Sequence, residues 1–345
     1  MKPVLPVAVA AALLPVVPVH AAAPRNPFVI VKRTPGTPGA VVLTGKKSGF
    51  SFWVSGQGKA RKVTAYRYDG KAWKASRLPA GLSGYDPAVG AAASGASSVW
   101  AVITAGSKRS STLIRWDGRR WRIVKRFPGE SLTGVAVLSR RNVWVFGDAG
   151  EKSVARHFDG RKWTRRTLPD LDLDGVHQGA GRIWAISARK RQVVRWTGKA
   201  WKPVALPKGS GEAMTLAVTG GRVTLGTMTV DTSGAEPKLA SHLLTWDGRA
   251  WRKEPGSPLV EKLWLRAAVP ARDGGLWVLG YDFDDESQHL LRRAPDGRWS
   301  RQALGTADNP YTYYTLTRVP GTSRLVTVAD RWDGEKNTGA ILMTR

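Results

Sequence analysis

The sequence predicts an all-β fold made of repeated four-stranded units, and three observations lead to this prediction. A hairpin motif, Asp-Gly followed by tryptophan, recurs along the chain, with its tryptophan at positions 73, 121, 163, 201, 251 and 299. Short runs rich in Val, Ile, Trp and Thr precede the copies, and Gly, Pro, Asp and Ser separate these runs, as is typical of strands. The amphipathic helices that would connect parallel strands are not recognisable.

The repeated hairpin is clearest at residues 114–129, IRWDGRRWRIVKRFPG. Asp-Gly favours a tight turn because glycine accepts positive φ and aspartate hydrogen-bonds the nearby backbone. A tryptophan just beyond the turn can bury a large surface against a neighbouring strand. Thr197 replaces the aspartate in one copy and the last copy is one residue shorter, which a turn tolerates better than a catalytic site. We therefore interpret these residues as structural: Asp69, Gly70, Trp73, Asp117, Gly118, Trp121, Asp159, Gly160, Trp163, Gly198, Trp201, Asp247, Gly248, Trp251, Gly297 and Trp299.

Each unit can be divided into strands in chain order. Runs such as GVAVL (134–138) and MTLAV (214–218) predict first strands. Second strands are predicted at 50–56, 98–106, 142–150, 182–187, 222–227 and 275–280. The Asp-Gly turn then joins the third strand to the fourth. Four-stranded units of about 40 to 50 residues, repeated around an axis, are typical of a β-propeller.

The two ends of the chain together supply one complete unit. Residues 311–345 contain only three strands, whereas FVIVKRTPG (28–36) matches WRIVKRFPG (121–129) at six of nine positions. We therefore predict that the N-terminal strand completes the last blade and closes the ring. This assignment gives seven blades, with six or eight as alternatives. The predicted blades are 37–80, 85–128, 132–169, 173–207, 212–256, 260–304, and 311–345 with 27–35.

Residues 1–23 have the pattern of a secretory signal peptide: one lysine, an apolar run with prolines, and small residues. They predict a protein that is secreted, extracellular or associated with the cell envelope, with residues 24–345 forming a single propeller domain. No later stretch approaches the roughly 20 apolar residues that a membrane span needs. Because the chain has no cysteine, an exported fold must be held together by packing alone.

The chain is strongly basic, with a formal net charge of +28. Such a charge attracts polyanions in a salt-dependent, largely non-specific way and repels copies of itself, so we expect a monomer. Nucleic acid is therefore expected to bind only as a non-specific polyanion. A soluble surface rich in Arg and Lys, with no dedicated partner, is an equally good explanation of the charge.

The spacing of the hairpin motif resembles the Asp-box of sialidases and related propellers, and the chain as a whole resembles secreted bacterial seven-bladed propellers. The Asp-box reads Asp-x-Gly-x-Thr-Trp, whereas this chain reads Asp-Gly-x-x-Trp, so only the Gly-to-Trp interval agrees. The resemblance implies a propeller fold. Sialidase activity would further imply three arginines that grip a carboxylate, a Tyr-Glu pair and an acidic Asp. Because the chain has no FRIP-like segment, no catalytic residue is transferred.

Candidate binding residues are expected on one face of the ring. In this strand order the connections between blades and the turns between second and third strands share a face, here called the loop face, which usually binds ligands in such folds. The outer strands and the opposite face, here called the turn face, should be basic. Candidate binding residues on the loop face are Asp86, Asp282, Asp284, Asp285, His289, Tyr311, Tyr313 and Tyr314. A solvated acidic turn, and tyrosines that merely belong to a strand, are the structural alternatives.

One further acidic segment, DLDLDG (170–175), matches the first half of a calcium loop. Asp170, Asp172 and Asp174 are therefore candidate calcium ligands, although Gln178 and Gly181 do not fit the later ligand positions. No other cofactor is predicted, because neither a phosphate loop nor a histidine spacing for a metal is present.

The leading interpretation is an exported, non-catalytic propeller that binds or scaffolds at the cell envelope or outside the cell, with an anionic polymer as a candidate ligand. The alternative is a glycan-binding or glycoside-hydrolysing sialidase-like propeller that uses acidic loop-face residues, since carboxylates about 5 to 10 Å apart can hydrolyse glycosides. A protein-assembly platform is a third interpretation. The fold alone does not distinguish these functions.

Overall fold

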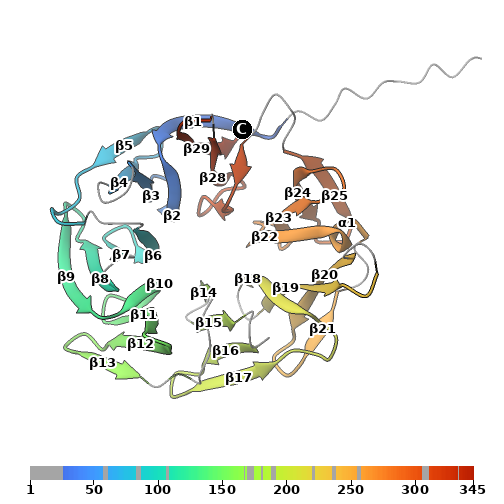
Figure 1. The fold of residues 1–345 in the computed structure, drawn as a ribbon, viewed down its shortest axis with the longest axis horizontal. Helices are drawn as coiled ribbons and strands as arrows, with labels where there is room; N and C mark the ends of the chain where they lie inside the picture. Colours follow the sequence, from blue (N-terminus) through green and yellow to red (C-terminus); the bar gives the residue numbers. More distant parts are fainter. Residues whose placement is uncertain are drawn as a thin grey trace, which may run out of the picture.

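A computed structural model of the chain places seven antiparallel sheets in a ring (Figure 1). The structure describes residues 26–56, 61–82, 87–105, 109–166, 168, 175–179, 182–187, 192–219, 222–234, 238–254, 258–304, 311–332 and 334–345. In six of the sheets the strands are added outward in chain order, so the first strand is innermost and the fourth lies on the rim. The predicted seven-bladed all-β propeller is confirmed.

The first six blades each contain four strands. Blade one comprises β2 (Thr37–Gly45), β3 (Ser48–Ser55), β4 (Lys62–Tyr68) and β5 (Trp73–Ser76). Blade two comprises β6 (Ala88–Gly95), β7 (Ser98–Ala105), β8 (Ser110–Trp116) and β9 (Trp121–Pro128). Blade three comprises β10 (Ser131–Ser139), β11 (Asn142–Ala149), β12 (Lys152–Phe158) and β13 (Trp163–Arg166).

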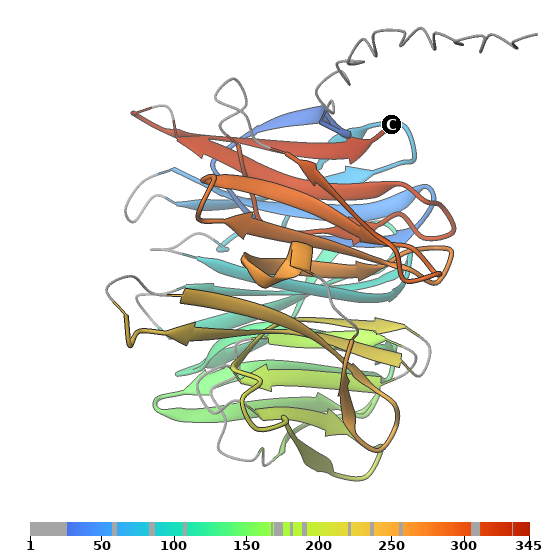
Figure 2. The same ribbon diagram turned by 90° about the vertical axis from the view of Figure 1, so that its right-hand side faces the viewer.

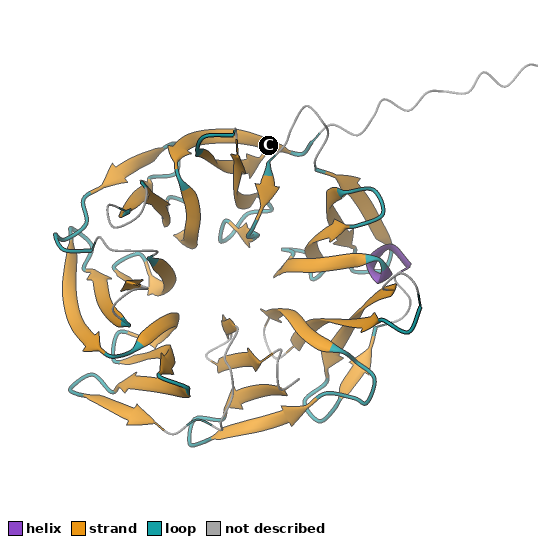
Figure 3. Cartoon of the chain, in the orientation of Figure 1, coloured by secondary structure: helices purple, strands orange, loops and turns teal. Residues whose placement is uncertain are grey.

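Blade four comprises β14 (Gly175–Gly179), β15 (Arg182–Ser187), β16 (Gln192–Trp196) and β17 (Trp201–Ala205). Blade five comprises β18 (Glu212–Thr219), β19 (Arg222–Asp231), β20 (Lys238–Trp246) and β21 (Trp251–Lys253). Blade six comprises β22 (Leu263–Pro270), β23 (Leu276–Asp282), β24 (Ser287–Arg293) and β25 (Trp299–Ala303). The short helix α1 (Pro258–Glu261) precedes blade six, and strands otherwise dominate the ring (Figures 2 and 3). Within the described residues, no helix has the length and apolar character needed to cross a membrane.

Blade seven joins the two ends of the chain, as predicted. It comprises β26 (Thr312–Tyr313), β27 (Thr317–Arg318), β28 (Leu325–Trp332), β29 (Asn337–Thr344) and β1 (Phe28–Pro35). The β1 strand pairs antiparallel with β29, from Phe28 opposite Thr344 to Pro35 opposite Thr338, and the two lie side by side in Figure 1. The ring is therefore closed by non-covalent strand pairing.

The first strand of blade seven differs from the prediction of one continuous run. It is split into β26 and β27, which both pair with β28. Between them, the hydroxyl of Thr327 donates to the carbonyl of Thr315 at 2.5 Å, and Leu316 is only 8% exposed. A side chain thus replaces a backbone partner at this point, which interrupts the ladder.

Each Asp-Gly turn between a third and a fourth strand is closed by the aspartate itself. In blade two, Asp117 Oδ1 accepts from the backbone N–H groups of Arg119 (2.9 Å) and Arg120 (3.0 Å). Gly118 has φ +105°, a conformation that favours glycine. Thr197 uses its hydroxyl oxygen, which accepts from the N–H three residues further on at 3.1 Å. The same pair of carboxylate bonds is made by Asp69, Asp159 and Asp247.

The aromatic residue that begins each fourth strand packs against the preceding blade. Trp121 is 5% exposed, and its ring centroid lies 4.8 Å from that of Phe50 and 5.5 Å from that of Phe52 in blade one. The same contact is made by Trp73 with blade seven, Trp163 with blade two, Trp201 with blade three, Trp251 with blade four and Trp299 with blade five. Phe28 on β1 takes this place in blade seven and packs with Leu279 of blade six. The hydrophobic core is therefore a series of layers between blades.

We expect deletion of residues 24–36 to destabilise the ring by several kcal/mol, because it removes a paired strand and the Phe28 contact. Thermal unfolding of residues 24–345 and of the chain without the segment measures this effect. A peptide of residues 26–36 should restore part of the lost stability, whereas the same peptide carrying Phe28→Ala should restore less. Equal melting temperatures for the full and truncated chains would contradict the closure.

We expect Trp121→Ala to lower the free energy of unfolding by about 3 to 5 kcal/mol, because a buried aromatic layer between two blades becomes a cavity. Trp332→Ala is the matched control, since Trp332 is 64% exposed and should change stability by no more than about 0.5 kcal/mol. Urea unfolding monitored by circular dichroism gives both values. A similar loss in the two variants would argue against the inter-blade packing.

Candidate functional site

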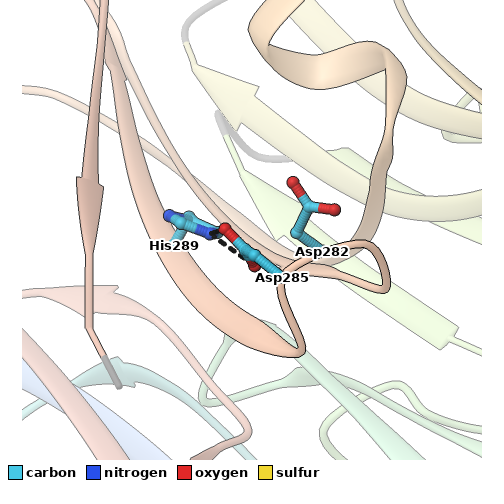
Figure 4. A group of neighbouring side chains, drawn as sticks. All are labelled: Asp282, Asp285 and His289. Atoms are coloured by element: carbon cyan, nitrogen blue, oxygen red, sulfur yellow. Dashed lines mark hydrogen bonds and ion pairs between the residues drawn. The ribbon is translucent and has the colours of Figure 1, made fainter. Parts of the chain in front are cut away.

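The turn between β23 and β24 brings three of the predicted site residues together (Figure 4). Asp282 ends β23, Asp285 lies in the turn, and His289 follows on β24. One potential ligand atom from each residue lies within 4.8 Å of the others. Asp282 and His289 are each 4% exposed, whereas Asp285 is exposed. The cluster is therefore a half-buried acidic site on the loop face of blade six.

Arg301 on β25 occupies the centre of this cluster. Its Nη2 lies 2.6 Å from Asp282 Oδ2, 3.1 Å from Asp285 Oδ2 and 2.6 Å from His289 Nε2. The sequence analysis missed this residue, because Arg301 pairs opposite Leu291 on the neighbouring strand and is twelve positions from His289. The only available signal was the expected β24–β25 hairpin, and its register was not predicted closely enough.

Two neighbours of His289 require opposite hydrogen-bonding roles of its Nε2 atom. Arg301 can only donate to Nε2, whereas the ionised Asp285, whose Oδ2 lies 3.0 Å away, can only accept from it. Burial, followed by the positive charge of Arg301, lowers the pKa of His289. Burial raises the pKa of Asp285, but hydrogen bonds from Ser287 and His289 outweigh it and hold this pKa below its ordinary value. At neutral pH the site therefore contains a neutral imidazole, an ionised Asp285 and the Arg301 cation.

This arrangement limits the chemistry of the cluster. Two carboxylates and an imidazole are suitable donors for a divalent cation, but a metal ion would compete with Arg301 for the same atoms. A glycoside hydrolase needs one carboxyl group that stays protonated near neutral pH. Asp285 has the opposite tendency, so Asp285 is not suited to be that acid.

Asp284, the other acidic candidate among the described residues, does not join this site. Asp284 forms a 2.6 Å ion pair with Lys262 instead. On the same face, the buried Glu130 is paired with both Nε and Nη2 of Arg156. Asp282, Asp284, Asp285 and Glu130 of this face are thus paired with cations. The remaining candidates, Asp86, Asp170, Asp172 and Asp174, lie outside the described residues.

The three predicted tyrosines are placed differently from one another. Tyr313 is fully buried and its hydroxyl accepts from Asn26 Nδ2 at 2.8 Å, while Tyr311 is 8% exposed and its hydroxyl accepts from Arg33 at 2.6 Å. Both therefore hold the closing strand and its flank. Tyr314 is 41% exposed and donates to Asp330 Oδ1 at 2.9 Å. Burial and this carboxylate raise the pKa of Tyr314 to about 12.

An exposed aromatic group lies beside the acidic cluster and was also missed by the sequence analysis. The rings of Trp264 and Phe283 are 5.8 Å apart, and those of Tyr281 and Phe283 are 5.0 Å apart. Trp264 is 37% exposed and Phe283 is 47% exposed. Such rings present flat apolar surface to solvent. In the sequence, Trp264 and Tyr281 are indistinguishable from ordinary strand residues.

Exposed cations cover the outer strands and the turn face. On the outer strands they are Lys74, Arg122, Lys125, Arg126, Arg165, Arg166, Lys202, Arg252 and Lys253. In the turns they are Lys71, Arg119, Arg120, Arg161, Lys162, Lys199, Arg249 and Arg298. The turn carboxylates face only part of this charge: Asp69 pairs with Lys74 at 2.8 Å, Asp117 with Arg122 at 2.7 Å and Asp247 with Arg252 at 2.6 Å. This basic surface matches the charge distribution expected for the rim and the turn face.

Comparison with solved structures supports the fold. The chain is similar to YCF48 bound to D1 peptide, with 14% identity, a TM-score of 0.62 and coverage of 95% of this chain and 98% of that one. It is similar to the WD40 repeats of RRP9, with 11% identity, a TM-score of 0.60 and coverage of 94% and 99%. It is also similar to the propeller of the Trilobed protease from Pyrococcus furiosus, described with an open velcro topology, with 10% identity, a TM-score of 0.58 and coverage of 90% and 94%. No protein-family model and no curated protein matches the chain. Identities this low establish the propeller fold alone.

We expect Arg301→Gln to raise the pKa of His289, because it removes a cation that disfavours the imidazolium and leaves two carboxylates that favour it. NMR titration of the histidine ring signals measures the change. Arg298→Gln is the control, since Arg298 pairs with Asp296 in the neighbouring turn. An unchanged or lower pKa of His289 in the Arg301 variant would show that the guanidinium does not control this site.

Proposed function

We propose that the protein is an exported, non-catalytic β-propeller that binds an anionic polymer at the cell envelope or outside the cell. The binding surface is the set of exposed cations on the outer strands and the turn face. Export is inferred from the signal-peptide pattern of residues 1–23, which lie outside the described residues. The propeller serves as a rigid scaffold for this surface.

The proposal rests on the excess of exposed cations over carboxylates on the turn face. The carboxylates of Asp69, Asp117 and Asp247 are each occupied by backbone N–H groups and by one cation. Further exposed cations in the same turns have no carboxylate of this kind to neutralise them. Since the outer-strand cations extend the same surface around the rim, a long polyanion can contact several blades at once, which favours polymers over small anions.

A second candidate function is glycan binding on the loop face. The exposed rings of Trp264 and Phe283 favour it, because sugar rings stack on flat aromatic surfaces and the neighbouring Asp284 carboxylate can accept hydroxyl hydrogen bonds. A glycan ligand would depend on these rings and would be insensitive to salt.

We expect binding of a linear polyanion such as polyphosphate to weaken at least tenfold between about 50 and 200 mM salt, because several counterions are released on binding. An array that carries polyanions and neutral glycans, probed at both salt concentrations, measures this dependence. Asp282→Asn with Asp285→Asn should leave polyanion binding intact. Salt-independent capture of a neutral glycan that is lost in Trp264→Ala with Phe283→Ala would support the second candidate instead.

A further inference from the structure

A cavity of about 510 Å³ lies between blades one and two on the turn face. Blade one contributes the last part of its outer strand, and blade two contributes its Asp-Gly turn. Five cations line the cavity together with one carboxylate: Arg67, Lys74, Arg77, Arg119, Arg120 and Asp69. The cavity therefore lies where the basic outer strand of blade one meets the basic turn of blade two.

The carboxylate in this cavity is already occupied. Asp69 pairs with Lys74 at 2.8 Å and accepts backbone bonds from its own turn. Within the described part of the chain, no carboxylate pairs with Arg77, Arg119 or Arg120, and all three are exposed. Three guanidinium groups therefore face one cavity without an anionic partner.

The walls of the cavity are held in place by contacts between the blades. The guanidinium of Arg67 lies 5.2 Å from the ring centroid of Trp116 in blade two. Trp121 Nε1 donates to Ser76 Oγ at 3.2 Å, so the serine hydroxyl keeps its own hydrogen for another acceptor. Groups held in this way lose little conformational freedom when a ligand binds.

The charge is not the same at every junction. The residue two positions before the turn aspartate is Arg67 in blade one and His157 in blade three. The residue five positions after it is Lys74 in blade one and Thr164 in blade three. The junction of blades three and four thus lacks cations at positions where the junction of blades one and two has them. The junction of blades two and three carries cations at the corresponding positions, so the two neighbouring junctions share this concentration of charge: Arg115, Arg122, Arg161 and Lys162.

We infer that this cavity is an anchoring site for phosphate groups of an anionic polymer, an inference that rests on the proposed function. Guanidinium forks pair with oxyanions through two parallel hydrogen bonds. Forks from Arg67, Arg77, Arg119 and Arg120 approach from two blades, which suits a tetrahedral group with several oxygens better than a planar carboxylate with two. The polymer then continues over the basic rim.

Calorimetric titration of the full exported chain with sodium tripolyphosphate tests the site. We expect Arg77→Gln/Arg119→Gln/Arg120→Gln to lose at least about tenfold in affinity, because charge-assisted hydrogen bonds are removed. The matched control is Lys152→Gln/Lys208→Gln/Lys238→Gln, which removes the same charge from exposed residues outside the outer strands and the turn face. It should change the affinity less than about threefold, as expected for screened charge at a distance. Thermal unfolding confirms that both variants are folded.

Equal losses in the two triple variants would overturn the anchoring site and leave the proposed function standing. If tripolyphosphate failed to bind while long polyphosphate bound in a salt-dependent way, the anchoring site would likewise be overturned and the proposed function would stand. Poly-glutamate that binds as tightly as polyphosphate, with the same dependence on the three arginines, would overturn the choice of phosphate. Absence of binding to every polyanion at low salt would overturn both the site and the proposed function.

Discussion

The packing of one aromatic side chain into the preceding blade is the interaction on which the rest of the molecule depends. A four-stranded sheet has two apolar faces, and a single blade cannot bury either face by itself. Trp121 covers the face of blade one, just as Trp163 covers the face of blade two. Because each blade is stabilised by its neighbours, the ring is most stable when no junction is missing. This condition makes closure necessary in a chain that has no disulfide to replace it.

Closure by β1 follows from the same constraint. Blade seven takes β26 to β29 from the C-terminal end, so without β1 the Phe28 contact with the face of blade six around Leu279 would be lost. Phe28 occupies the position that tryptophan holds elsewhere. Tyr311 and Tyr313 then fix the segment around it through Arg33 and Asn26. Two of the residues that the sequence suggested as a binding surface are thus used to hold the ends of the chain together.

The sequence was sufficient for the architecture because the signals of the architecture are local. Asp117 and Gly118 mark a turn by their own conformational preferences, and the match between 28–36 and 121–129 identified the missing strand. The site was less predictable because its geometry depends on register. Arg301 reaches His289 only through the exact pairing of β24 with β25, and nothing within either strand indicates that contact. Burial of Tyr313 beside an exposed Tyr314 likewise depends on the split first strand of blade seven.

Turn formation and surface charge are linked in this repeat. In three of the turns the carboxylate accepts backbone N–H groups and the cation five residues later neutralises what charge is left, as Arg122 does for Asp117. In these three turns a further arginine or lysine, such as Arg119 or Arg120, adds positive charge that the turn carboxylate does not balance. Because the turn is repeated, the excess positive charge is distributed around the rim. Where a basic turn meets a basic outer strand, these cations line a cavity. Arg119 and Arg120 meet Arg77 in this way, so positive charge is concentrated at an inter-blade junction by the same packing that builds the ring.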